Sequence, residues 1–128
     1  MRHKYSKLAE LQTGNQNRSN VIRTFLTNIV KHGQITTTPK RAKIIVAETN
    51  HFFCHLLSMF KKYDEAWAKR EMIRFLKSTI RTEDEGKKVL TDYIARYKEQ
   101  KNKTNFTSTY KTTLRKWDAV QNILIRLD

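Results

Sequence analysis

The sequence has very little cysteine, proline or glycine: its 128 residues include one cysteine, one proline and three glycines. The lone cysteine, Cys54, cannot form a disulfide within the chain, which fits a reducing compartment. So few glycines leave no Gly-rich phosphate loop, dinucleotide fingerprint or nucleophile elbow, and an enzyme of these classes is not expected. No run approaches the roughly 18 apolar residues of a membrane-spanning helix. The start, MRHKYSKLAEL, is basic, lacks the apolar core of a secretory signal and is expected to lead into the first helix without a cleaved leader.

Acidic residues are also scarce. The chain has 12 of them against 26 Lys and Arg, a formal net charge of +14. Residues 1–43 contain nine of the basic residues and one acid, Glu10, so this third carries most of the excess. Like charges repel one another in a compact chain, and a polyanionic partner would offset that repulsion. Nucleic acid is the favoured partner and an anionic membrane surface the less favoured one, while a merely solvated basic surface does not explain the absence of acids.

Hydrophobic periodicity predicts helices in the first three quarters of the chain. In residues 18–32 apolar side chains recur at i, i+1, i+4 and i+5, and Gly33 follows at the usual place of a left-handed cap. Residues 34–36 are expected to be short and extended. A second helix is predicted to begin with Thr38 as its N-cap and Pro39 at its first helical position, and to carry a long apolar face.

Two more helices are predicted downstream. The third spans residues 63–80 and is expected to turn four apolar residues inward: Trp67, Ile73, Leu76 and Ile80. The fourth opens at a capping box formed by Thr82 and Glu85. Its apolar stripe consists of Val89, Leu90, Tyr93, Ile94 and Tyr97.

After residue 104 the period changes to two, which is typical of strands. One predicted strand shares a face among Phe106, Ser108, Tyr110, Thr112 and Leu114, and the other among Ile123, Ile125 and Leu127. The intervening RKWDA predicts a hairpin with a five-residue connection or a bulge, with Tyr110 in the core and Trp117 in the turn, open to solvent. The sequence therefore predicts an α+β fold, with helices packed on a small antiparallel C-terminal sheet. Residues 1–16 are a basic extension and residues 17–128 a single globular domain.

The residues that suggest chemistry have simpler structural explanations. Four potential metal ligands fall within eight residues: Glu48, His51, Cys54 and His55. The two histidines have the i, i+4 spacing of paired ligands, but Phe and Leu interleave with them, so this segment is interpreted as core helix. The acids at 64–65 and 83–85 lie at predicted helix starts, where they complement the helix dipole. Trp117 and Tyr110 could stack on bases, as aromatics do in single-strand binders. We expect no cofactor, no metal and no small-molecule substrate.

The stretch TTTPKRAK, residues 36–43, is the best candidate for binding a polyanion. Phosphates are contacted by Lys, Arg, Thr, Asn, backbone amides and helix N-termini. Free N–H groups, hydroxyls and three cations come together here at one helix start. Such contacts position a protein on nucleic acid without reading base sequence.

Four segments together resemble a known family. They are MRHK at the start, NRSNVIRTFLTNIVKHGQITTTPKRAK over 17–43, KVLTDYIARYKEQ over 88–100, and NFTSTYKTTLRKWDAVQNILIRLD over 105–128. In order and spacing they resemble the bacterial-type family of large-subunit ribosomal protein seventeen. The chain departs from the family pattern at Thr104–Asn105, where a glycine pair is usual, at Ser108, where an arginine is usual, and at Trp117, which replaces a turn glycine.

The resemblance implies a structural constituent of the large ribosomal subunit that binds large-subunit rRNA near the exit side of the nascent-chain tunnel, beside neighbouring ribosomal proteins. The ribosome would be that of a bacterial cytoplasm or of an organelle matrix. The expected RNA-binding residues are Arg2, His3, Lys4, Lys7, Arg18, Arg23, Lys31, His32, Thr37, Thr38, Lys40, Arg41 and Lys43, with Lys111, Arg115 and Lys116 on the hairpin. The alternatives are a non-ribosomal nucleic-acid-binding module and an amphipathic membrane-surface protein.

Overall fold

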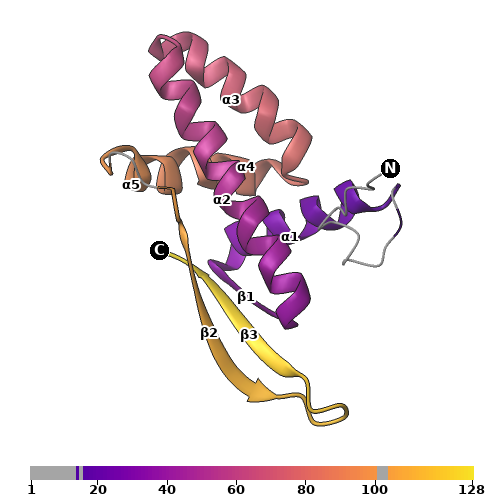
Figure 1. Cartoon of the computed structure of the whole chain (residues 1–128). Helices are drawn as coiled ribbons and strands as arrows, with labels where there is room; N and C mark the ends of the chain where they lie inside the picture. Colours follow the sequence, from indigo (N-terminus) through magenta and orange to yellow (C-terminus); the bar gives the residue numbers. More distant parts are fainter. Residues whose placement is uncertain (1–13, 15, 101–103) are drawn as a thin grey trace, which may run out of the picture.

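A computed structural model describes residues 14, 16–100 and 104–128 (Figure 1). The elements in chain order are α1 (Arg18–His32), β1 (Gln34–Thr37), α2 (Pro39–Lys62), α3 (Glu65–Thr79), α4 (Glu83–Lys88), a π-helical turn η2 (Val89–Tyr93), α5 (Ile94–Lys98), β2 (Thr107–Leu114) and β3 (Gln121–Leu127). Helices packed on a small antiparallel sheet confirm the predicted α+β class. Most of the predicted basic extension, residues 1–13 and 15, lies outside the described residues.

The junction between α1 and α2 forms as its residue types predict. Gly33 ends α1 in the left-handed conformation, with φ of 75°, and its N–H donates to the Ile29 carbonyl at 2.8 Å. Thr38 is the extended N-cap of α2 and Pro39 is its first helical residue. The six residues between the helices, 33–38, are therefore held at both ends by local chemistry.

The extended segment after Gly33 has a larger role than predicted, because it is a full strand of the sheet. The strand order is β1-β3-β2, and both pairings are antiparallel. β1 pairs with β3 from Gln34 opposite Arg126 to Thr37 opposite Ile123. The ladder between β2 and β3 has an irregularity between Lys111 and Leu114, inside β2 and ahead of the RKWDA segment where a bulge was expected. The central strand β3 thus pairs on one side with β2, its neighbour in the chain, and on the other with β1 from the first third of the chain.

Only one face of the sheet is covered, and it is not the face predicted for β2. Thr109 lies opposite the buried Ile125, so Thr107, Thr109 and Lys111 lie on the same face as Ile125, and Thr107 is the one of them that is buried. Tyr110 lies opposite Leu124 on the other face and is exposed, so its predicted core position is wrong. Phe106 is buried because it precedes the ladder and packs among helix residues, with its ring 5.5 Å from that of Phe53.

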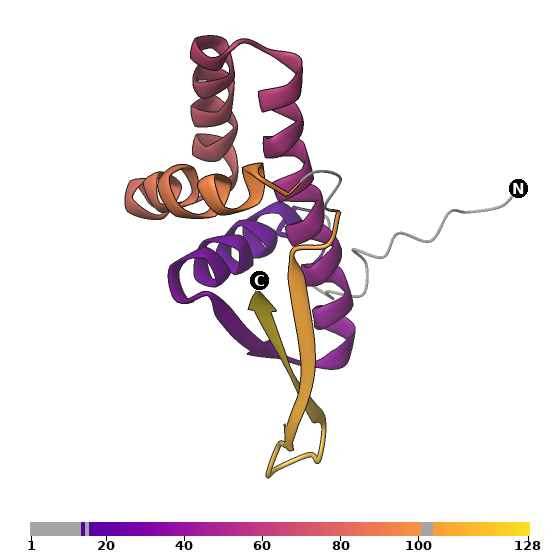
Figure 2. The same cartoon turned by 90° about the vertical axis from the view of Figure 1, so that its left-hand side faces the viewer.

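The core lies between α2 and the elements that surround it. α2 runs through the middle of the molecule, with α3 along its upper half and the β2–β3 hairpin beside and beyond its lower end (Figure 1). The continuous helical segment 83–98 crosses between α3 and α1 (Figure 2). Phe53 of α2 is fully buried, with its ring 5.2 Å from that of Tyr97 and 5.9 Å from that of Tyr93. The stripe predicted for the fourth helix therefore does face the core.

The third helix is rotated relative to the prediction. Trp67 and Ile73, expected inward, are 47% and 43% exposed, and the residues that face α2 are Ala68, Met72 and Leu76, spaced at i, i+4 and i+8. Ile80 is buried as predicted. Thr82 is the N-cap of α4, but its side chain makes no capping hydrogen bond, so the capping box does not form. No helix within the described ranges is long and apolar enough to cross a membrane.

Candidate nucleic-acid interface

The start of α2 concentrates positive charge where a helix normally carries negative charge. Lys40, Arg41 and Lys43 are exposed, and the first turn of α2 contains no acid. By contrast, α3 has Glu65 in its first turn and α4 has three acids, at 83–85. Cations at a helix N-terminus oppose the helix dipole, so this arrangement stabilises α2 only when an anion is bound there.

The same helix start also leaves hydrogen-bond donors free. The Thr38 side chain makes no capping hydrogen bond, and the Thr38 carbonyl accepts from the N–H of Ala42 at 2.8 Å. Pro39 has no N–H, so Lys40 and Arg41 present the unpaired amides of the first turn. A phosphate oxygen placed there would meet backbone donors and flexible cations together.

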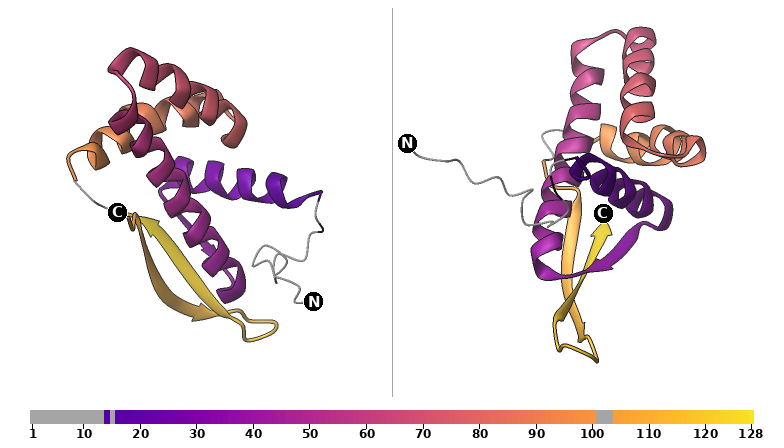
Figure 3. Two further views of the ribbon diagram at one scale, coloured as in Figure 1. Left: turned by 45° about the horizontal axis from the view of Figure 1, so that its top comes forward. Right: turned by 90° about the vertical axis from the view of Figure 1, so that its right-hand side faces the viewer.

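The sheet brings the hairpin to this helix start. Thr37, the last residue of β1, and Lys111 of β2 both lie opposite Ile123, on its two sides. Residues opposite one another in a ladder share a face, so Lys111 is on the same face as Thr37, about 10 Å away across two strand spacings. The hairpin continues past the end of β1, and its turn and the start of α2 lie at the same end of the molecule in all views (Figures 1 and 3).

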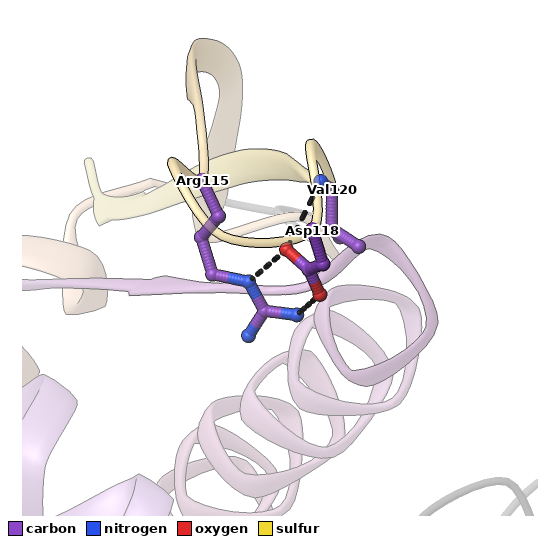
Figure 4. Close-up of polar contacts among 3 residues, drawn as sticks. All are labelled: Arg115, Asp118 and Val120. Atoms are coloured by element: carbon purple, nitrogen blue, oxygen red, sulfur yellow. Dashed lines mark hydrogen bonds and ion pairs between the residues drawn. The ribbon is translucent and has the colours of Figure 1, made fainter.

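The hairpin turn is held by an ion pair (Figure 4). The Arg115 guanidinium donates to both carboxylate oxygens of Asp118, with Nε 3.0 Å from Oδ1, and the N–H of Val120 donates to the same Oδ1 at 3.3 Å. The Arg115 hydrogen bond, followed by the backbone bond, holds the pKa of the Asp118 carboxyl below its ordinary value of 3.8. The guanidinium also lies over the Trp117 ring, 4.5 Å from its centroid. Lys116 is exposed beside them.

The remaining predicted residues are not all at this end. Arg18 and Arg23 of α1 are half-buried, and the buried Nε atom of each has no hydrogen-bond partner among the residues that the structure describes. Lys31 and His32 are exposed in the last turn of α1, where the Lys88 ammonium donates to the Lys31 carbonyl at 3.0 Å. Arg2, His3, Lys4 and Lys7 lie outside the described residues.

Arg81 makes polar contacts with α1 that the sequence patterns did not predict. Its backbone N–H donates to Thr27 Oγ1, its Nε donates to Thr24 Oγ1 at 3.1 Å, and its guanidinium also reaches the Asn20 carbonyl at 3.0 Å. It borders a groove of about 440 Å³ along α1. The only signal in the sequence was an arginine directly before an N-cap threonine, and its partners are far away in the chain. Arg81 ties the end of α3 to α1.

The departures from the family pattern have local structural uses. The Ser108 hydroxyl donates to Asp128 Oδ1 at 2.6 Å, so this position serves an intrachain contact. The Asn50 amide donates to Asn105 Oδ1 at 3.2 Å, and Asn50 Oδ1 accepts from the N–H of Phe106 at 2.9 Å. These bonds fix the start of β2 against α2.

No group of three or more His, Cys, Asp or Glu side chains in the described part of the chain could hold a metal ion. The His51 and His55 rings are stacked 6.3 Å apart on the exposed side of α2, and Cys54 Sγ makes a hydrogen bond of 3.7 Å to the Thr104 carbonyl. Phe52, Phe53 and Leu56, between these residues, are buried. The segment is therefore a core helix with a polar outer edge.

Comparisons with known proteins agree with this picture. The family model described as Ribosomal protein L17 matches residues 21–128. Similar curated proteins are those named large ribosomal subunit protein bL17 from three strains of Clostridium perfringens, SM101, ATCC 13124 and strain 13. Each is 32% identical to this chain over 111 residues, which cover 86% of this chain and 88% of the relative.

Proposed function

The chain belongs to the ribosomal protein L17 family, and from this premise we propose that it binds large-subunit rRNA through the start of α2 and the β2–β3 hairpin. Membership makes it a structural protein of the large ribosomal subunit and not an enzyme. Its partners are therefore rRNA and other ribosomal proteins. The geometry of the site supports the proposal of how the chain contacts rRNA.

One observation carries the proposal. The first turn of α2 holds Lys40 and Arg41, with Lys43 directly after it, and no acid, although the same chain places acids at the starts of α3 and α4. Each misplaced charge disfavours the free helix by about 0.3–1 kcal/mol at low ionic strength. A bound phosphate reverses the sign of that interaction, because it is attracted by the dipole, the amides and the cations at once.

The finer placement follows from the resemblance. We propose that residues 1–16 act as a phosphate-neutralising extension, with the domain 17–128 as a wedge. We propose a site near the exit side of the nascent-chain tunnel, in the ribosome of a bacterial cytoplasm or of an organelle matrix. The relatives named above are bacterial.

The non-ribosomal alternative has less support. A helix-turn-helix module needs a recognition helix whose polar face reaches base edges. Beyond its first turn, α2 is a core element, with Ile44, Ile45, Phe52, Phe53 and Leu56 buried. The cations of α2 other than Lys61 and Lys62 gather at its start, and that suits phosphate contact better than base readout.

The test is sedimentation of a cell or organelle extract through a sucrose gradient, probing for this chain. Comigration with the large subunit after a moderate salt wash is expected. Binding of the purified chain to large-subunit rRNA should also weaken by about 10³- to 10⁵-fold between about 50 and 200 mM salt, if six to ten phosphates are contacted. A chain that stays in the light fractions at low salt, or a flat salt profile, contradicts the proposal.

A further inference from the structure

The hairpin exposes a large aromatic side chain at its tip. Trp117 is 79% exposed, more than any other large hydrophobic residue in the described part of the chain. Two more exposed large hydrophobics, Tyr110 and Leu114, lie on the adjoining strand. Single apolar residues on a surface are ordinary, but three within eight residues of one projecting hairpin are typical of a contact site.

The turn presents this ring in a fixed way. The Arg115 N–H donates to the Val120 carbonyl at 2.9 Å, and the Ala119 N–H donates to the Arg115 carbonyl at 2.9 Å. Ala119 has a φ of 56°, a left-handed conformation that L residues rarely adopt and that persists only where surrounding bonds enforce it. The Arg115–Asp118 ion pair closes the same turn (Figure 4). Because the turn is already ordered, little further conformational entropy is lost when a partner binds.

One face of the ring is already occupied by a cation. The Arg115 guanidinium covers it at 4.5 Å from the centroid, and the exposure of the side chain leaves the opposite face to solvent. Residues 111–118 contain three cations, Lys111, Arg115 and Lys116, against one acid, Asp118, whose charge Arg115 neutralises. An open aromatic face within positive potential is the combination that single-stranded nucleic acids bind, by stacking and by phosphate contact.

We propose that Trp117 stacks on an unpaired base of the RNA to which this chain binds. The inference rests on the proposed function, because the hairpin turn lies at the same end of the molecule as the start of α2 (Figure 3). RNA strands whose phosphates meet the α2 start are therefore within reach of the turn. An acidic or apolar protein surface is the rival occupant, but the cations around Trp117 and the continuity with the phosphate site favour RNA.

The direct test uses the fluorescence of Trp117. The chain has two tryptophans, so Trp67→Phe leaves Trp117 as the sole emitter. This variant is titrated with a short single-stranded oligoadenylate and, separately, with heparin, a polyanion without bases. Stacking predicts strong quenching by oligoadenylate and little by heparin at equal saturation. Equal quenching by both polyanions would overturn the proposal, because charge alone would then account for the change.

Affinity for large-subunit rRNA provides the second measurement. Trp117→Ala is expected to weaken binding by about 5- to 150-fold, the equivalent of about 1–3 kcal/mol for one stacked base, while Trp117→Phe retains most of it. The matched control is Trp67→Ala, on α3 at the other end of the molecule, which should leave affinity unchanged (Figure 1). Circular-dichroism melting of each variant checks that the fold is retained, as expected for an exposed side chain.

The outcomes separate this inference from the proposed function. If the wild-type chain has no salt-sensitive affinity for rRNA, the proposed function fails. If the wild-type chain binds but Trp117→Ala binds equally well, only the stacking inference fails. Unchanged rRNA affinity combined with poor incorporation of Trp117→Ala into large subunits would overturn it in favour of a protein partner. Loss of affinity with an unchanged salt dependence supports it, since stacking removes no phosphate contact.

Discussion

Replacing Lys40, Arg41 and Lys43 together by Ala tests the α2 start most directly. If each cation neutralises one phosphate, the slope of log affinity against log salt should become shallower by roughly 2–3, at about 0.7–0.9 per contact. A rise from about 50 to about 200 mM salt spans roughly 0.6 logarithmic units, so the variant should lose roughly 20- to 40-fold less affinity over that range than the wild-type chain does. The assay is filter binding or anisotropy with large-subunit rRNA at several salt concentrations.

Stability gives the same experiment a second readout of opposite sign. The three cations oppose the dipole of α2, and none forms an ion pair with another described residue. Their removal should leave the free energy of unfolding unchanged or raise it by up to about 2 kcal/mol at low salt, at about 0.3–1 kcal/mol for each cation of the first turn. A drop in melting temperature would refute the reasoning, because the cluster would then be holding the fold.

A matched control removes the same charge elsewhere. Lys61, Arg70 and Lys77 are exposed residues of α2 and α3, far from the α2 start along the chain. Their triple Ala variant also lowers the formal net charge from +14 to +11. It should lose little affinity and keep most of the salt slope. If both triple variants lose affinity equally, net charge alone governs binding and the α2 start has no special role.

Three further predictions concern the fold itself. Thr49 is fully buried, and its hydroxyl has no hydrogen-bond partner among the described residues. Thr49→Val should therefore stabilise the fold by about 1 kcal/mol and raise the melting temperature by roughly 3–5 °C. A lower melting temperature would mean that the hydroxyl does have a hydrogen-bond partner. Phe53→Ala, at the centre of the aromatic core, should destabilise by about 3–5 kcal/mol in a denaturant titration, and a cost under 1 kcal/mol would contradict the packing. Burial raises the pKa of Tyr97 to about 12 from 10.0, so folding favours its neutral form. The resulting contribution of Tyr97 to stability is complete below pH 10 and is lost as pH rises toward 12. An ultraviolet titration should show a late step that Tyr97→Phe abolishes.

The stability of the hairpin turn at low pH can also be predicted, because Arg115 holds the pKa of Asp118 low. A depressed carboxyl pKa stabilises the turn above the ordinary value of 3.8, and this support is lost as pH falls through the lower folded value. Trp117 fluorescence in the Trp67→Phe background should therefore change with a midpoint below pH 3.8. The change should be absent in Asp118→Asn, and a midpoint above 3.8 would argue against the ion pair in solution.

Local patterns predicted most of the elements because they depend on neighbouring residues. The i, i+4 stripe of α1, the left-handed Gly33, the Thr38–Pro39 start of α2 and the core stripe of 89–97 are each determined within one or two helical turns. The family and the cationic α2 start could be identified from the same short segments. The α2 part of the candidate site could thus be predicted before any tertiary contact was known.

The errors arose where a choice depends on a partner far along the chain. Which apolar residues of α3 face inward depends on how α2 lies beside it, so Ala68 and Met72 are buried in place of Trp67 and Ile73. The covered face of β2 depends on its register with β3, which puts Tyr110 outside. A period-2 pattern shows that two faces exist but not which one meets the core.

The sequence by itself determined the helices, the helix ends at Gly33 and Thr38, the concentration of cations and the family. Only the tertiary structure decided that Gln34–Thr37 is a strand, because its hydrogen-bonding partner is the last strand of the chain. That pairing brings Thr37 and Lys111 to the two sides of Ile123 and sets the hairpin turn beside the start of α2. The pattern of a strand does not specify its partner along the chain, so the approach of the hairpin to the start of α2 is a property of the fold.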